Sequence, residues 1–380
     1  MNKETLQQIF QQYIDKFTFL NAEPQEEYYK WQVCREYPGL MKAALESDND
    51  LLPRKLYEAK KSTYNIIDSY TQPFSGLVDL AKEDPDSVRK MLLDLYSDDG
   101  GDIKTQMEII SDFFNRSSEL VQKYYPESFR YKQDSHSVSA LLFLKDPDHH
   151  YMFKATHCHS FAECVEFYDD WGAGNIIKLD VFYRFCDELL EEIKADKALM
   201  STDESRFDSR IAYKGGELHP DTEKHILLFD IIYCCSAYGL YDGVSFTKRN
   251  AAEKKLYKEN KETARKLKAE YDQAVEDDEK LRNTLLELAD MIKPGMKVKT
   301  KKHGEGVVDK ADDRYVTATF ADGTTEIGLP IGLSNKILVF ESNEVSDKAD
   351  SVKFLLKNYK EIPKRVEQKS RALKPYEEYL

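Results

Sequence analysis

Apolar residues recur at helical spacing through the first part of the chain. Within residues 1–17 they stand three and four positions apart, at Leu6, Ile9, Phe10, Tyr13, Ile14 and Phe17. This spacing places them on one face of a helix, with polar residues on the other. Residues 26–45 have the same period, and their large rings are expected to fill the core. Residues 83–121 predict two further helices, and residues 179–200 and 221–238 predict one each.

The period changes between residues 138 and 156. Two short apolar runs rich in branched and aromatic residues, VSALLFL and YMF, flank the turn-forming Asp146-Pro147-Asp148. Short apolar runs on both sides of such a turn are typical of a β-hairpin. We therefore predict a small β-hairpin near residues 138–156, within a mainly helical body that covers residues 1–250.

The remainder of the chain predicts three further segments. Residues 251–292 are highly charged, yet Leu281, Leu285 and Leu288 keep helical spacing, which predicts a long charged linker helix. Residues 293–342 hold short β-branched runs divided by glycine and aspartate, which predicts a small β-barrel of about five strands. Residues 343–380 predict a C-terminal helical tail. The fold class is therefore α+β.

Charge is distributed unevenly along the chain. Residues 291–380 contain 17 Lys and Arg against 14 Asp and Glu, which leaves 38 against 55 for residues 1–290 of a chain with 55 and 69 in total. The acidic body should repel a phosphate backbone on average. Any nucleic-acid contact is thus expected at local patches or in the C-terminal part.

The six cysteines lack CxxC spacing, and Cys234 and Cys235 are adjacent within an apolar run. Buried thiols in a reducing compartment fit this pattern. The first twenty residues do not resemble a signal peptide, and no stretch of about 18 uncharged apolar residues occurs. We predict a cytoplasmic protein that requires no cofactor and contacts no membrane.

A basic stretch opens the predicted barrel. Lys297, Lys299 and Lys301 alternate along a strand and should share one face, where they could follow a phosphate backbone. Lysines on a sheet edge also protect against aggregation, and that alternative stays open. The candidate nucleic-acid or partner-binding residues are Lys297, Lys299, Lys301, Lys302, His303 and Arg314.

A methyl-lysine cage is disfavoured in the same segment. It would need several exposed aromatic rings around one cation. The barrel offers only Tyr315, Phe320 and Phe340, and at least one of these should be core.

Residues 295–308, with the KHGEG turn at 302–306 and the Val307-Val308 strand, resemble the small Tudor-like barrel of UvrD-type helicases and CarD-type transcription factors. Gly304 and Gly306 would permit a tight bulged turn between the first two strands. The resemblance implies binding to nucleic acid or to a nucleic-acid-processing protein. That family usually has a large aromatic residue where this chain has His303.

Three segments of the body are similar to the region preceding the AAA+ motor of bacterial McrB-type restriction proteins: EYYKW at 27–31, DPDSVRKMLLDLY at 84–96 and ALLFLKDPDHHYMFK at 140–154. The resemblance implies a setting in bacterial restriction-like defence, with a separate ATPase or nuclease as partner. The sequence contains no GxxxxGK[ST] loop, so nucleotide hydrolysis by this chain is not expected.

Possible metal ligands concentrate around the predicted hairpin. Asp148, His149, His157 and His159 could hold zinc if they converged. Strand alternation would put His157 and His159 on one face and Cys158 on the other, and no pair has the spacing of a zinc finger. A polar turn with ordinary surface histidines is the favoured interpretation.

A nuclease would need an Asp followed by a Glu-x-Lys group to bind Mg²⁺ and activate water. Asp148 with Glu192 and Lys194 approximates this pattern, but the last two lie in an acid-rich helical segment where surface pairing between residues four positions apart explains them. No catalytic residue is assigned. The sequence predicts a non-catalytic recognition or adaptor protein, and the alternative is a metal-dependent nuclease or other hydrolase.

Overall fold

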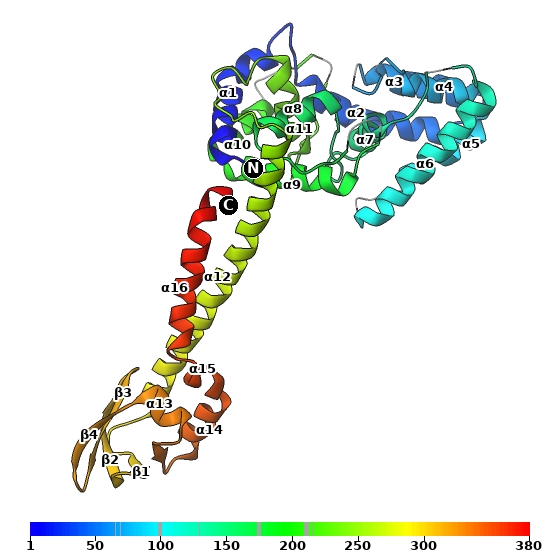
Figure 1. Ribbon diagram of the computed structural model, residues 1–380. Helices are drawn as coiled ribbons and strands as arrows, with labels where there is room; N and C mark the ends of the chain where they lie inside the picture. Colours follow the sequence, from blue (N-terminus) through cyan, green and yellow to red (C-terminus); the bar gives the residue numbers. More distant parts are fainter. Residues whose placement is uncertain are drawn as a thin grey trace. The chain divides into compact units, whose positions relative to one another are not determined.

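A computed structural model describes residues 1–64, 66–68, 70–97, 101–128, 130–172, 176–208, 213–214 and 216–380. The fold is α+β and mainly helical, as predicted (Figure 1). The chain divides into two compact units, Met1–Lys248 and Arg249–Leu380. Within the described ranges, none of the helices combines the length and apolar character needed to cross a lipid bilayer.

The first unit is helical in its described parts. Its elements are α1 (Lys3–Asn21), α2 (Tyr29–Leu45), α3 (Leu52–Ser62), α4 (Pro73–Glu83), α5 (Pro85–Leu95), α6 (Ile103–Tyr124), α7 (Ser135–Lys145), α8 (Ala155–Cys164), α9 (Leu179–Ala195), α10 (Lys197–Glu204), the 3₁₀ turn η1 (Ser205–Phe207) and α11 (His225–Ala237). Helix starts follow local capping chemistry, since Asp84 and Asp102 accept backbone N–H bonds at the starts of α5 and α6.

Helix α11 forms the centre of this unit. Its side chains are buried on almost every side, as expected for a helix that is apolar all round. It packs against α1, α2, α8 and α9. The six cysteines are all buried, as the sequence predicted, and burial raises the pKa of the Cys235 thiol.

The β-hairpin predicted near 138–156 is wrong. Residues 135–145 form α7, whose side chains from Ser137 to Leu144 are all buried, and residues 155–164 form α8. Asp134 and Ser137 form a capping box that starts α7. Because α7 is buried on all sides, its apolar run has no 3.6-residue period to distinguish it from a buried strand.

The second unit begins with one long helix and continues into a sheet. Its elements are α12 (Ala251–Met291), β1 (Lys297–Thr300), β2 (Gly304–Ala311), β3 (Tyr315–Phe320), β4 (Gly323–Gly328), α13 (Leu329–Ser334), β5 (Val339–Phe340), α14 (Asn343–Ser351), α15 (Lys353–Lys357), α16 (Glu361–Leu373) and the 3₁₀ turn η2 (Lys374–Tyr379). The long charged helix, the five strands and the C-terminal helices were all predicted.

The five strands form one antiparallel sheet in the order β4-β3-β2-β1-β5. Val298, Val316 and Phe340 point from it into a second core, together with Leu288 of α12 and Leu356 of α15. The sheet is therefore held against the C-terminal end of α12 by apolar packing.

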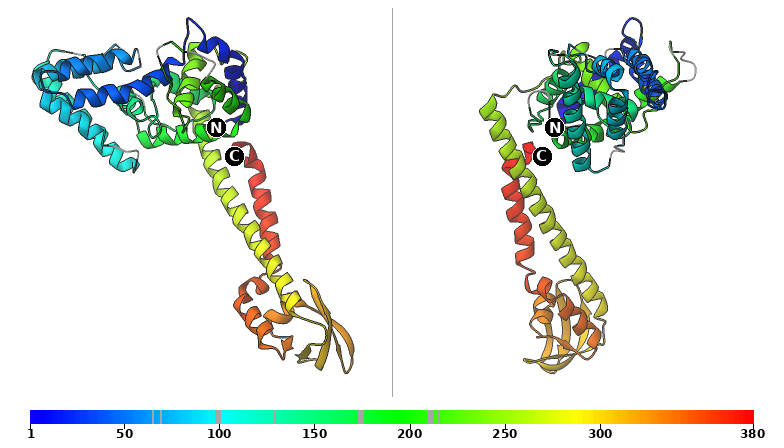
Figure 2. Two further views of the ribbon diagram at one scale, coloured as in Figure 1. Left: turned by 180° about the vertical axis from the view of Figure 1, so that it is seen from behind. Right: turned by 90° about the vertical axis from the view of Figure 1, so that its right-hand side faces the viewer.

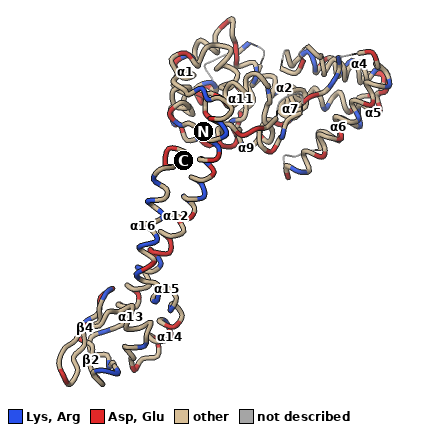
Figure 3. Tube along the Cα trace, in the orientation of Figure 1, with Lys and Arg blue, Asp and Glu red and all other residues tan. Residues whose placement is uncertain are grey.

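Helices α12 and α16 lie side by side (Figures 1 and 2). The pair is charge-matched: Lys369 Nζ lies 2.6 Å from Glu270 Oε2, and Arg365 Nη1 lies 3.3 Å from Asp277 Oδ2. Figure 3 shows basic and acidic residues interspersed along both helices. These exposed ion pairs contribute more to the register of the two helices than to stability.

Gly306 lies very close to the neighbouring strand β3. It lies opposite Val298 on β1 and Phe320 on β3. A Cβ atom at this position would lie 2.7 Å from the carbonyl oxygen of Thr319 and closer still to the Phe320 ring. Only glycine fits here without displacing β3.

We predict that Gly306→Ala destabilises the second unit by about 1–3 kcal/mol, because the added methyl group overpacks the contact with Phe320. Faster amide hydrogen exchange in β1, β2 and β3 would report this loss. Lys310→Ala, at an exposed position of the same strand, should leave exchange unchanged. Equal exchange in the two variants would contradict the prediction.

Candidate functional site

Strand β1 presents two of the predicted lysines to solvent. Its residues alternate between exposed and buried, so Lys297 and Lys299 share the outer face while Val298 and Thr300 point inward. Lys301 and Lys302 follow the strand in an exposed turn. The structure therefore shortens the predicted row of three lysines on the strand to two.

Both strand lysines have acidic partners. Lys297 Nζ lies 3.2 Å from Glu341 Oε1, and Lys299 Nζ lies 3.4 Å from Glu305 Oε1. The register explains the pairing, because Glu305 stands opposite Lys299 on β2 and the Glu341 N–H donates to the Lys297 carbonyl. The local charge on this surface is balanced.

Two exposed valines complete the surface, which we call the β1 face. Val307 stands opposite Lys297, and Val339 stands opposite Lys299. They are 44% and 48% exposed. Together with the aliphatic stems of the two lysines, they line a mainly apolar groove of about 440 Å³. The β1 face consists of Lys297, Lys299, Glu305, Val307, Val339 and Glu341.

The remaining predicted binding residues lie outside this groove. His303 Nδ1 is 2.7 Å from Asp322 Oδ2, and its ring lies 5.4 Å from that of Phe320. Arg314 is exposed in the turn between β2 and β3. Phe320 and Phe340 are buried and Tyr315 is half exposed, so these three rings do not form a cage.

The four metal candidates have separate partners. Asp148 accepts the Glu223 N–H, and His149 pairs with Asp146 at 2.9 Å. His157 Nδ1 lies 2.5 Å from Ser236 Oγ, while His159 Nε2 accepts the Trp171 indole N–H at 3.2 Å. Within the described ranges, these four residues are not brought together as a ligand set.

The nuclease candidates are only partly adjacent. Lys194 Nζ lies 2.8 Å from the Glu223 carboxylate, and the Glu223 N–H donates to Asp148. Glu192 instead pairs with Lys3 of α1. Each charge is thus engaged at the surface, but with partners distant in sequence and not with the i,i+4 neighbours that the helical interpretation predicted.

Sequence reasoning missed a chain of buried ionic contacts through the first unit. Three cations and three carboxylates alternate along it, with one tyrosine hydroxyl between its two halves and a second at its end. In order, the chain consists of Lys224, Asp203, Arg206, Tyr13, Asp230, Lys30, Glu27 and Tyr238.

Lys30 lies between two carboxylates of this buried ionic chain. Its fully buried ammonium contacts Asp230 Oδ1 and lies 2.7 Å from Glu27 Oε2. Burial is the largest single effect and opposes the charge, but the combined attraction to Asp230, Glu27 and neighbouring groups outweighs it and raises the pKa of Lys30. The Tyr13 hydroxyl donates to the second oxygen of Asp230 at 2.5 Å.

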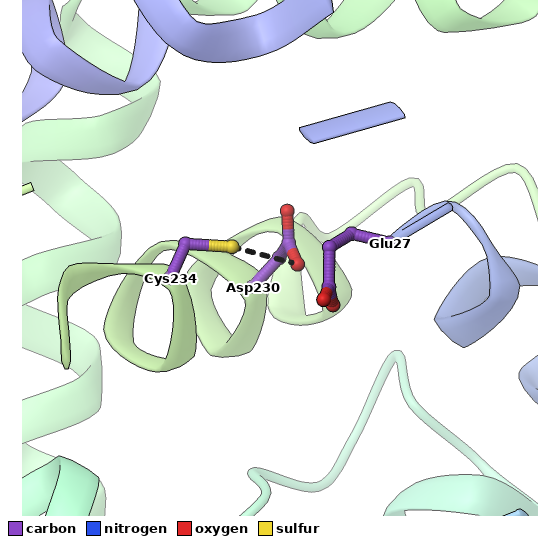
Figure 4. Close-up of side chains that lie close together, drawn as sticks. All are labelled: Glu27, Asp230 and Cys234. Atoms are coloured by element: carbon purple, nitrogen blue, oxygen red, sulfur yellow. Dashed lines mark hydrogen bonds between the residues drawn. The ribbon is translucent and has the colours of Figure 1, made fainter. Parts of the chain in front are cut away.

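Glu27, Asp230 and Cys234 also converge on one another (Figure 4). The Cys234 thiol donates to Asp230 at 3.5 Å, and burial raises the pKa of that thiol. A metal ion would need the thiolate and a space that the Lys30 ammonium fills. We therefore interpret this group as part of the buried ionic chain.

One signal in the sequence points to this chain. Asp230 is the sole charged residue in the apolar run ILLFDIIYCC. A carboxylate in a helix that is otherwise apolar requires a buried cation. That argument predicts a cationic partner but does not identify Lys30.

Comparisons of the chain with protein-family models, with curated proteins and with solved structures found no match.

We predict that Lys30→Met destabilises the first unit by about 3–5 kcal/mol, because it leaves two buried carboxylates without their cation. Both tryptophans, Trp31 and Trp171, are buried in this unit. Urea unfolding followed by tryptophan fluorescence of the full chain therefore measures this unit alone.

Lys42→Met is the matched control, since Lys42 lies on the same helix in an exposed pair with Glu46. It should unfold as the wild type does. Adding Asp230→Asn to Lys30→Met should recover part of the loss. A Lys30→Met protein as stable as the control would refute the role assigned to the chain.

Acidification should also destabilise the first unit. Burial is the largest cause that lowers the pKa of five histidines, namely His136, His157, His159, His219 and His225. The pKa of His157 falls to about 4. Between pH 6.5 and 4 the unfolded chain takes up protons that the folded unit does not. The free energy of unfolding of this unit therefore decreases as the pH is lowered through that range. The urea midpoint should be lower at pH 5.0 than at pH 7.5.

Asp221 acts in the opposite direction. Burial raises its pKa to about 7, so the folded unit takes up this proton and gains stability as the pH falls below 7. Asp221→Asn should therefore enlarge the difference between the two midpoints. A midpoint that does not fall at pH 5.0 in either protein would contradict the histidine assignment.

Proposed function

We propose that this protein is a non-catalytic recognition protein whose second unit binds a partner protein along the β1 face. The observation that supports this is the composition of that face: two exposed valines between two balanced ion pairs, on a sheet held by its own core. Exposed apolar groups rimmed by polar ones are typical of protein-binding surfaces.

Charge favours a protein over nucleic acid as the occupant. Binding to a phosphate backbone depends on Lys and Arg whose positive charge is not already compensated. Glu305 and Glu341 compensate Lys299 and Lys297 on the β1 face. A protein segment that carries charges of both signs around an apolar side chain would match the pattern.

The expected occupant is an extended segment of the partner. Val307 and Val339 lie diagonally across β1, on opposite sides of Lys297 and Lys299, and with the lysine stems they supply the apolar surface of the groove. One apolar side chain of the segment would enter the groove, while its charged neighbours exchange partners with the two ion pairs.

The biological setting is a further proposal that depends on the two resemblances. The Tudor-like features of residues 295–308 and the McrB-like segments of the body support a place in bacterial restriction-like defence or nucleic-acid processing. A separately encoded ATPase or nuclease would then be the partner.

We predict that Val307→Asp with Val339→Asp abolishes partner binding, because two carboxylates would have to be desolvated in the groove. When tagged full-length protein is used to capture partners from cell extract, the wild type should retain a defined protein that the double variant does not retain. Ile337→Asp, at a 39% exposed position outside the groove, is the control and should retain it.

A parallel assay examines the nucleic-acid alternative. Duplex DNA and RNA probes are titrated against the wild type and against Lys297→Glu with Lys299→Glu at two salt concentrations. Salt-sensitive binding that this variant loses would overturn the protein-partner proposal, as would equal retention of every protein by Val307→Asp/Val339→Asp.

A further inference from the structure

A polar pocket of about 410 Å³ opens in the first unit beside the buried ionic chain. Four tyrosines line it: Tyr28 immediately before α2, Tyr29 on α2, Tyr64 after α3 and Tyr233 on α11. Tyr29 and Tyr64 meet edge to face with their centroids 5.5 Å apart. Glu27 and Lys154 lie in its wall. The pocket therefore combines aromatic surface with charge.

Lys154 differs from the other charged residues of the pocket. Its side chain is half-buried and its ammonium lies 5.2 Å from the centre of the Tyr233 ring. Among the described residues, no carboxylate lies within ion-pair distance of it. By contrast, Lys214 pairs with Glu23 and Glu26, and Glu27 pairs with Lys30.

The charge of Lys154 is not matched within the buried ionic chain. The buried ionic chain is balanced, because Lys30, Arg206 and Lys224 match its three carboxylates. Lys30 also lies close enough to repel Lys154, and Tyr233 carries both ammonium groups near its ring, at 4.1 and 5.2 Å. A half-buried ammonium without a counter-ion destabilises the fold unless a ligand supplies the anion.

We propose that this pocket binds a small organic anion, a carboxylate or phosphate ester with a flat ring, whose charge contacts Lys154 and whose ring packs against the tyrosines. The site lies in the first unit and does not depend on the function proposed for the β1 face.

Two further features support an anion at this position. Lys154 is the N-cap residue of α8, so its backbone lies at the helix end that carries partial positive charge. Burial, followed by repulsion from Lys30, lowers the pKa of Lys154. An anion would relieve both effects, and the tyrosine rings would supply the apolar contact.

The proposal is tested with defined probes and the full-length protein. Calorimetry or ligand-detected NMR measures binding of benzoate, phenyl phosphate, inorganic phosphate and neutral benzamide. One of the two aromatic anions should bind at least about tenfold more tightly than benzamide, as expected for a hydrogen bond to a charged group. The ratio of benzoate to phenyl phosphate affinity distinguishes the two anion classes.

Variants separate binding from folding. Lys154→Met should weaken the aromatic anion about tenfold or more while raising the urea midpoint of the first unit, because it removes an uncompensated buried charge. Lys154→Arg should retain binding, and Lys178→Met, at an exposed lysine of the same unit, should change neither. Equal binding of benzamide, unchanged binding by Lys154→Met, or no binding of any probe would overturn the proposal.

Discussion

The first unit depends on the ion pair between Lys30 and Asp230. Both side chains are fully buried, and a charge in that environment is tolerated only beside its counter-charge. The pair joins α2 to α11, and the Tyr13 hydroxyl adds α1 to the same carboxylate. Arg206 then connects Tyr13 to Asp203. These directional contacts specify how four segments distant in sequence meet, which apolar packing alone specifies less strictly.

The second unit is organised on a different principle. Its ion pairs lie on the surface, and its specificity comes from apolar packing of the sheet on α12 and from close backbone approach at Gly306. Charge in this unit is matched across surfaces, between α12 and α16 and across β1. The same kind of pairing therefore aligns the helices and neutralises the lysines of the β1 face.

The sequence predicts elements well where one side of an element faces water. The amphipathic period of α1, the seam of α12 and the alternation of β1 each identify the element and its buried face. It fails for α7, because an apolar run buried on all sides has no period and the length of such a run suits strand and helix alike. The overlooked signal was the capping pair Asp134 and Ser137, which belongs to helix starts.

For the candidate site residues too, local sequence patterns predict some features and not others. Placement of Lys297 and Lys299 on one face follows from strand alternation, whereas their pairing with Glu341 and Glu305 depends on register across three strands. Lys154, Glu27 and Tyr233 come together only through the packing of α2, α8 and α11. No local pattern carries that information, because the three residues come from separate segments of the sequence.

The return of α16 along α12 brings the first and last residues of the second unit together. Tyr379 contacts Tyr257 with ring centroids 5.4 Å apart, so the last residues lie beside the first turns of α12. A helix of 41 residues extends about 60 Å. The sheet and its β1 face thus lie at the opposite end of the α12 and α16 helix pair from Arg249, where the second unit begins. Changing α12 and α16 by matched whole turns would alter that separation without altering the sheet.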